Sequence, residues 1–168
     1  MSKPFVAVLM GSDSDLPVMR STLEVLAGFD INYEVKVTSA HRTPAATHAY
    51  VADAQSRGCG VFICAAGLAA HLAGAVAGIT TRPVIGVPID CGPLQGMDAL
   101  LSTVMMPGGV PVASVAIGKA GAKNAGYLAA QMLAIADDEL AEKVKLDRQK
   151  NAEAVVAKDA ALQKELSK

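Results

Sequence analysis

The feature that most constrains this fold is a regular alternation of short apolar runs with segments of helical periodicity. Five apolar runs predict strands, at residues 5–10, 33–38, 61–65, 83–87 and 111–117. Helical patterns follow them at residues 13–27, 44–57, 69–79, from 97 onwards, and at 122–135. Repeated βα units of this kind predict an α/β protein with a parallel sheet and helices on both faces. The fold class is therefore a three-layer α/β/α sandwich.

The 168 residues suit a single catalytic domain, residues 1–168, with a doubly wound five-stranded parallel sheet of the flavodoxin-like type. We expect its core to span residues 4–136. The composition becomes strongly charged after that point, and spaced apolar positions over residues 138–164 predict an amphipathic helix. This C-terminal helical arm, residues 137–168, has two interpretations of equal weight. It is either a solvated flank of its own domain or an arm laid on a neighbouring subunit.

Composition and charge exclude several classes of function. The formal net charge of −1 gives no electrostatic footprint for nucleic acid or an anionic membrane, so neither is expected as a partner. The three cysteines are an odd number without a CxxC motif or a Cys/His cluster, so we expect free thiols, a cytoplasmic protein and no metal. We also expect no signal peptide and no membrane-spanning segment.

Three loops that directly follow strands hold the groups best suited to a ligand. The candidate residues are Ser12, Ser14 and Asp15 in the first loop, Ser39, His41 and Arg42 in the second, and Gly67, Ala69, His71 and Leu72 in the third. The carboxyl ends of parallel strands meet at one edge of the sheet, and ligands bind there where the strand order reverses. The three loops are therefore expected to form one small site.

The first loop favours a phosphorylated sugar. Helix-opening N–H groups and the Ser12 hydroxyl suit a phosphate, whereas the Asp15 carboxylate suits sugar hydroxyls. The alternative is plain helix capping by Ser12 or Asp13. Neither GxGxxG nor GxxxxGK[ST] is present, so a dinucleotide or nucleoside triphosphate is not expected.

The second loop pairs an imidazole with a guanidinium. Arg42 presents a planar fork for phosphate or carboxylate, and His41 is suited to proton transfer near neutral pH. The alternative is an ordinary loop histidine beside a surface arginine. Thr43 and Pro44 predict a helix start with the threonine hydroxyl as N-cap. His71, in the third loop, is interpreted first as a helix-packing histidine bonded to the backbone.

At these loops the sequence resembles the N5-carboxyaminoimidazole ribonucleotide mutases of purine biosynthesis, the class I PurE family. The matching segments are residues 10–15 (MGSDSD), 39–44 (SAHRTP), 69–72 (AAHL), 83–88 (PVIGVP), 106–112 (MPGGVPV) and the Ala-rich stretch around 123–125. They follow the family's order over residues 5–135.

The resemblance implies an isomerase that moves a carboxyl group within its substrate, from the exocyclic nitrogen to C4, without metal or organic cofactor. It implies His41 as general acid and base, and it implies that Ser12, Asp15 and Arg42 hold the ribose phosphate. Ser14, Ser39, Gly67, Ala69, His71 and Leu72 are implied to lie around the ribonucleotide. The family assembles as a homo-octamer in which the C-terminal helix reaches over a neighbour.

The third loop departs from the family pattern GAGGAAHLPG. Ala65, Leu68 and Ala73 replace two glycines and a proline. A leucine with positive φ is strained, so we expect the loop to bend slightly differently and Leu68 to cap the pocket.

Three other functions stay open. A related carboxylase takes free CO2 and carries Lys where Arg42 stands, so Arg42 favours the mutase. A flavodoxin-like module without turnover would need aromatic side chains beside a flavin, and the loops have none. A regulatory nucleotide sensor would not need His41.

Overall fold

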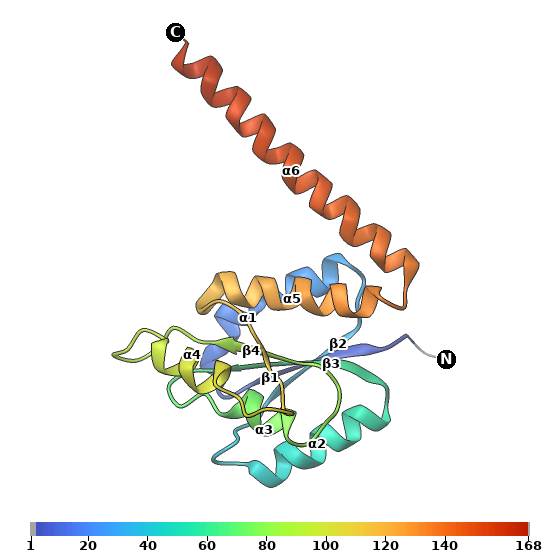
Figure 1. The fold of residues 1–168 in the computed structure, drawn as a ribbon, viewed down its shortest axis with the longest axis vertical. Helices are drawn as coiled ribbons and strands as arrows, with labels where there is room; N and C mark the ends of the chain where they lie inside the picture. The colour runs from blue at the N-terminus through green and yellow to red at the C-terminus, as the bar shows by residue number, and fades with distance from the viewer. Residues whose placement is uncertain (1–2, 168) are drawn as a thin grey trace.

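Five parallel strands form one sheet in the order β2-β1-β3-β4-β5 (Figure 1). The computed structural model describes residues 3–167. The strands are β1 (Phe5–Met10), β2 (Tyr33–Val37), β3 (Cys59–Ala66), β4 (Val84–Pro88) and β5 (Ala113–Ser114). The order reverses at β1, since β2 lies on one side of it and the later strands on the other. The predicted doubly wound sheet is confirmed.

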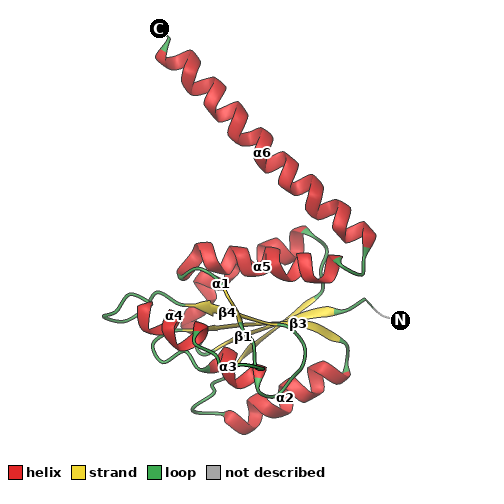
Figure 2. Ribbon diagram, in the orientation of Figure 1, coloured by secondary structure: helices red, strands yellow, loops and turns green. Residues whose placement is uncertain are grey.

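Helices cover both faces of this sheet, which completes the predicted three layers (Figure 2). They are η1 (Asp13–Asp15), α1 (Leu16–Gly28), α2 (Pro44–Ser56), α3 (Leu72–Ala77), α4 (Met97–Val104), α5 (Gly118–Ala134) and α6 (Asp138–Leu166). Helices α1 and α5 lie on one face, and α2 and α3 lie on the other (Figure 1). Helix α4 joins the second face, because its Thr103 and Ala73 of α3 both face Gly86 in β4.

The core explains why β1 is apolar at every position. Val6 and Val8 belong to the apolar cluster under α1 and α5, whereas Ala7 and Leu9 belong to the cluster under α2 and α3. All four side chains are fully buried. A strand covered on both faces needs apolar residues throughout, as parallel sheets generally do.

Three predicted boundaries are wrong. Only Ala113 and Ser114 of the predicted strand 111–117 pair with β4, and Pro111 has no N–H to add to the ladder. Helix α3 begins at Leu72 rather than at residue 69, because the preceding residues form a turn closed by His71 N–H to the Ala69 carbonyl, at 2.8 Å. Helix α5 begins at Gly118, earlier than the predicted residue 122.

Helix α6 is rooted on the core and then leaves it (Figure 1). The Asp137 side chain caps it by accepting from Leu140 N–H at 3.0 Å, and Leu140 is buried. Residues 148–167 are all exposed. Among residues 3–167, no helix has both the length and the apolarity needed to cross a membrane.

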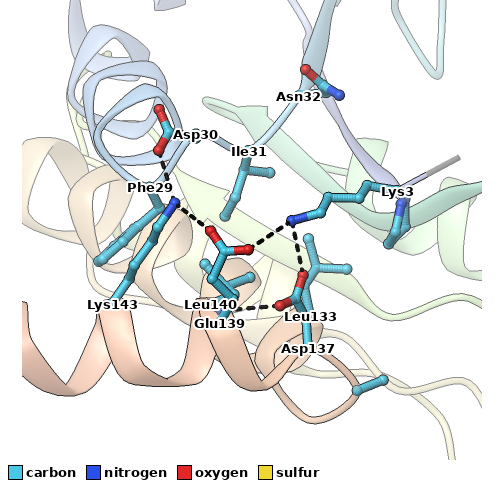
Figure 3. A pocket seen from close by; sticks show the side chains of 12 residues that line it. Lys3, Phe29, Asp30, Ile31, Asn32, Leu133, Asp137, Glu139, Leu140 and Lys143 are labelled. Carbon is cyan, nitrogen blue, oxygen red and sulfur yellow. Dashed lines mark hydrogen bonds and ion pairs between the residues drawn. The ribbon is translucent and has the colours of Figure 1, made fainter.

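Ion pairs fix the root of α6 around a cavity of about 270 Å³ (Figure 3). Lys143 lies 2.9 Å from Asp30 and 3.2 Å from Glu139, and Lys3 lies 3.5 Å from Asp137. Neighbouring lysines hold the pKa of Asp30 below its usual range, and the pKa of Asp137 is lowered first by the Leu140 N–H. The charged groups that line this cavity therefore form ion pairs with one another.

Helices α1 and α5 approach closely because α5 presents small residues. Thr22 of α1 donates its hydroxyl to the Ala122 carbonyl of α5 at 2.6 Å. A Cβ added at Gly126 would lie 2.9 Å from the Val25 Cβ and 3.1 Å from the Thr22 carbonyl oxygen. Position 126 therefore requires glycine, because any side chain there would collide with α1.

We predict that Gly126→Ala lowers the free energy of unfolding by about 1–2 kcal/mol, because overpacking outweighs the gain in helix propensity. Gly28→Ala is the matched control, since a Cβ at that helical position meets nothing within 4 Å. It should raise stability by up to about 0.5–1 kcal/mol. Urea unfolding at one protein concentration measures both. Equal stability of the two variants would contradict this account of the α1–α5 contact.

Candidate active site

A pocket of about 400 Å³ opens at the carboxyl edge of the sheet, where β1 and β3 are neighbours. The structure brings all ten candidate residues to its lining: Ser12, Ser14, Asp15, Ser39, His41, Arg42, Gly67, Ala69, His71 and Leu72. The position agrees with the general rule that ligands bind where the strand order reverses.

The first loop is a capping box. The Ser12 hydroxyl accepts from Ser14 N–H at 3.3 Å, and Ser12 N–H donates to the Asp15 carboxylate at 3.2 Å. The Ser14 hydroxyl adds a bond of 2.8 Å to the Ser12 hydroxyl. The capping interpretation of Ser12 is confirmed, and the same bonds hold two hydroxyls at the pocket.

Asp15 is the buried carboxyl group of the site, with 6% of its surface exposed. Burial raises the pKa of Asp15 above its usual range, while the Ser12 N–H opposes that shift. A carboxylate that is shielded from water is stabilised by hydrogen-bond donors, so Asp15 is suited to accept hydrogen bonds from ligand hydroxyls.

A threonine network fixes the second loop. The Thr38 hydroxyl lies 2.7 Å from the Thr47 hydroxyl inside the fold. Thr43 accepts from Ser39 N–H at 2.9 Å, and its own hydroxyl faces the Ser39 carbonyl at 3.2 Å. Thr43 precedes α2 as expected, but the prediction that its hydroxyl caps the helix is wrong, because Ser39 occupies it.

Arg42 joins the second loop to the first. Its Nη2 donates to the Gly11 carbonyl at 3.1 Å, and its backbone N–H donates to the Ser39 hydroxyl at 3.2 Å. None of the ion pairs formed within residues 3–167 involves Arg42. A guanidinium held at one nitrogen, with further donors exposed, is well suited to an anion.

Two histidines meet at the pocket. His41 Nε2 lies 2.7 Å from His71 Nδ1, and the ring planes are inclined by 80°. One nitrogen must donate and the other must accept, so the two facing atoms share one proton. The first interpretation of His71, as a packing residue bonded to the backbone, is therefore wrong. His71 is exposed and touches the candidate catalytic imidazole.

The third loop is not bent away from the left-handed region, contrary to expectation. Leu68 has a φ of 56°, so a leucine adopts the conformation that glycine usually supplies. Its side chain is half-exposed and lines the pocket. The neighbouring Gly67 lies against the Cys91 sulfur, which would collide with any side chain at position 67.

Sequence reasoning missed Cys91. This residue follows β4 and lines the pocket from a fourth loop. The signal was present, since every segment after a strand of this sheet begins at the same edge. The second cavity, at the root of α6, differs from this pocket because its charged groups already neutralise one another (Figure 3).

Comparisons with known proteins identify relatives over nearly the whole chain. A family model described as AIR carboxylase matches residues 5–154. The N5-carboxyaminoimidazole ribonucleotide mutase of Mycobacterium tuberculosis is 53% identical over 162 residues, covering 96% of this chain and 92% of the relative. The mutase of Thermotoga maritima is 56% identical over 142 residues, covering 84% and 82%. That of Bacillus subtilis is 50% identical, covering 92% and 95%.

Solved structures show the same architecture. The crystal structure of Treponema denticola PurE superposes with a TM-score of 0.86 at 30% identity, covering 95% of this chain and 98% of that one. A second crystal structure from that organism, of a PurE variant with one substitution, gives a TM-score of 0.88 at 29% identity, covering 96% and 99%.

The raised pKa of Asp15 predicts a pH-dependent cost of keeping it ionised. The folded state holds the proton more tightly, so ionisation reduces stability as pH rises above the unfolded pKa, and the loss is complete above the folded pKa. Asp15→Asn should thus raise the free energy of unfolding at about pH 7.5, and the gain should shrink toward about pH 4. Glu24→Gln, at an exposed carboxylate of α1, is the control. A gain independent of pH would contradict the assignment.

Proposed function

The chain belongs to the AIR carboxylase family, and on that premise we propose that its carboxyl-edge pocket binds a ribonucleotide and uses His41 as general acid and base. The protein acts in purine biosynthesis and converts N5-carboxyaminoimidazole ribonucleotide into 4-carboxy-5-aminoimidazole ribonucleotide, the activity its relatives' name gives. It is an isomerase. The observation that carries the site assignment is His41 facing His71 in a pocket whose other groups suit a sugar phosphate.

Two loops supply the groups that hold the substrate. Arg42 and the hydroxyls of Ser12 and Ser14 bind the phosphate, because they present donors beside one another. Asp15 accepts from the ribose hydroxyls. Ser39 supports this arrangement by accepting from the Arg42 backbone N–H. Gly67, Ala69 and Leu72 enclose the base with small or apolar surface.

The reaction needs one proton donor that is later a proton acceptor. His41 protonates the carbamate nitrogen as its bond to the carboxyl carbon breaks, which gives the free amine and CO2. C4 of the aminoimidazole then forms a bond to CO2, and the proton on C4 passes to His41. Protons balance over the cycle, so one imidazole suffices.

His71 acts on His41 through the shared proton. The two nitrogens lie 2.7 Å apart, so the protonation state of one ring determines what the other can donate or accept. His71 therefore holds His41 in one orientation and one tautomer at a time. A fixed orientation matters because proton transfer requires hydrogen-bond geometry to the reacting atom.

The remaining task is confinement. CO2 must stay beside C4, and water must stay out, until the new bond forms. The small side chains around Gly67 leave a narrow, largely apolar wall. Positioning and confinement carry most of the rate effect, because the protein forms no covalent bond to the substrate.

The carboxylase that uses free CO2 is the second candidate, and the names of the relatives favour the mutase. A flavin-binding module is disfavoured, because no Phe, Tyr or Trp among the described residues lines the pocket. Supplying purified protein with the carbamate substrate, or with aminoimidazole ribonucleotide plus bicarbonate, separates the two enzymes. Product from the second mixture alone would refute the mutase.

We predict that His41→Asn lowers kcat by about 10²–10⁴-fold while ligand affinity stays within about tenfold, because only proton transfer is removed. Arg42→Ala is the companion variant and should chiefly raise KM. Steady-state assays with product binding by calorimetry distinguish the two effects. Turnover retained in His41→Asn would end the catalytic assignment, and an unchanged KM in Arg42→Ala would make that residue structural.

We also propose a homo-octamer in the cytoplasm, with α6 lying on a neighbouring subunit. Supporting this, α6 extends beyond the core and exposes apolar side chains, namely Val155, Val156, Leu162 and Leu166. Free thiols at Cys59, Cys64 and Cys91 suit a reducing compartment.

Sedimentation equilibrium should give eight times the chain mass of 17.2 kDa. Replacing Val155 and Val156 with Lys should shift the distribution toward smaller species, since it places charge on the exposed part of α6. A mass that corresponds to a monomer would refute the octamer, and an unaltered octamer in the double variant would refute the role of α6.

A further inference from the structure

Two loops at the pocket are joined by a reciprocal contact between side chains and glycines. The loop after β3 contributes Gly67 and Leu68, and the loop after β4 contributes Cys91 and Gly92. The Cys91 sulfur occupies the space where a side chain at Gly67 would lie. In return, the Leu68 Cδ2 lies 2.6 Å from where a Cβ at Gly92 would be.

Both residues of the contact between Leu68 and Gly92 have an unusual backbone conformation. Leu68 has a φ of 56° and Gly92 has a φ of 74°, so both stand in the left-handed region. Position 92 requires glycine for two reasons. Its backbone is in the left-handed region, and the Leu68 side chain fills the space that a Cβ would occupy. Leu68 needs no side chain for its own turn, since glycine would adopt that φ without strain. The side chain of Leu68 is thus retained at the expense of backbone strain.

The contact falls in the middle of the loop after β4, which also contains a local bond from Gln95 N–H to the Gly92 carbonyl at 3.3 Å. Its beginning is held by Ile89 N–H donating to the Ala66 carbonyl at 2.9 Å. Its end is held at Gly96, where an added Cβ would lie 2.6 Å from the Ile117 Cγ2. Residues 92–95, between these points, are exposed. Leu68 therefore contacts the loop at Gly92, directly beside Cys91, which lines the pocket.

We propose that Leu68 is a positioning residue that holds the loop after β4 through Gly92, and with it Cys91 in the pocket wall, so that CO2 released from the carbamate is recaptured at C4 before it escapes. This role rests on the proposed function of the pocket. The step itself is unchanged: the N–C bond breaks with protonation at nitrogen, and the C4–C bond forms with loss of the C4 proton. Leu68 influences only the competition between recapture and escape.

The test follows carbon from substrate with a ¹³C-labelled carboxyl group in unlabelled bicarbonate buffer. Wild-type protein should keep the label in the product. Leu68→Ala should raise the release of aminoimidazole ribonucleotide and the loss of label about tenfold, with KM little changed, because a slightly misplaced wall weakens recapture more than binding. Leu68→Met should restore retention, since it again reaches Gly92. Uncatalysed decarboxylation is subtracted with a protein-free sample.

Leu94→Ala is the matched control, because Leu94 is an exposed leucine of the same loop that does not line the pocket. It should behave as wild type. Leu68→Gly, which removes both the side chain and the strain, keeps the test available where Leu68→Ala does not fold. Label retention in both variants equal to wild type would overturn the role of Leu68. Absence of any product from the carbamate with wild-type protein would instead overturn the proposed function itself.

Discussion

The parallel pairing on both sides of β1 is the constraint on which the site depends. Met10 pairs with Val37 of β2 and with Ala65 of β3, so all three strands end at one level. The pairing continues one residue further, through Gly11 N–H to the Ala65 carbonyl at 3.0 Å and Thr38 N–H to the Met10 carbonyl at 2.9 Å. Each loop of the site therefore starts from a fixed point, and only a few residues separate that point from the pocket.

Sequence alone predicted the layers, four of the strands and the edge at which the pocket lies, because these follow from buried apolar runs and from strand direction. It missed features that depend on tertiary distance. The contact between His41 and His71 follows from α3 starting at Leu72, which places His71 in the preceding turn. Strand β5 is short because Pro111 has no N–H to add to the ladder with β4. The left-handed Leu68 contradicts its own propensity, and the contact of its side chain with Gly92 joins two loops that are distant in sequence.

The chemistry of the pocket is sparse, and this agrees with a reaction in which the protein mainly positions and confines. Its charged and polar groups are bound to one another, through Ser12 with Asp15, Arg42 with Gly11, and His41 with His71. Side chains fixed by such bonds lower the cost of binding, since fewer of them must be immobilised by the ligand. The relatives, about half identical in sequence over most of the chain, share the name of one activity.

The strand order also determines when each strand gains its neighbours during synthesis of the chain. Strand β1, which lies between β2 and β3, leaves the ribosome well before its partner β3, which begins only at Cys59. Until then one edge of a fully apolar strand has no native neighbour, and unpaired strand edges of this kind promote aggregation during synthesis. The nascent chain is therefore most vulnerable between the emergence of these two strands, and the appearance of Ala65, the last residue of β3 that pairs with β1, ends that period.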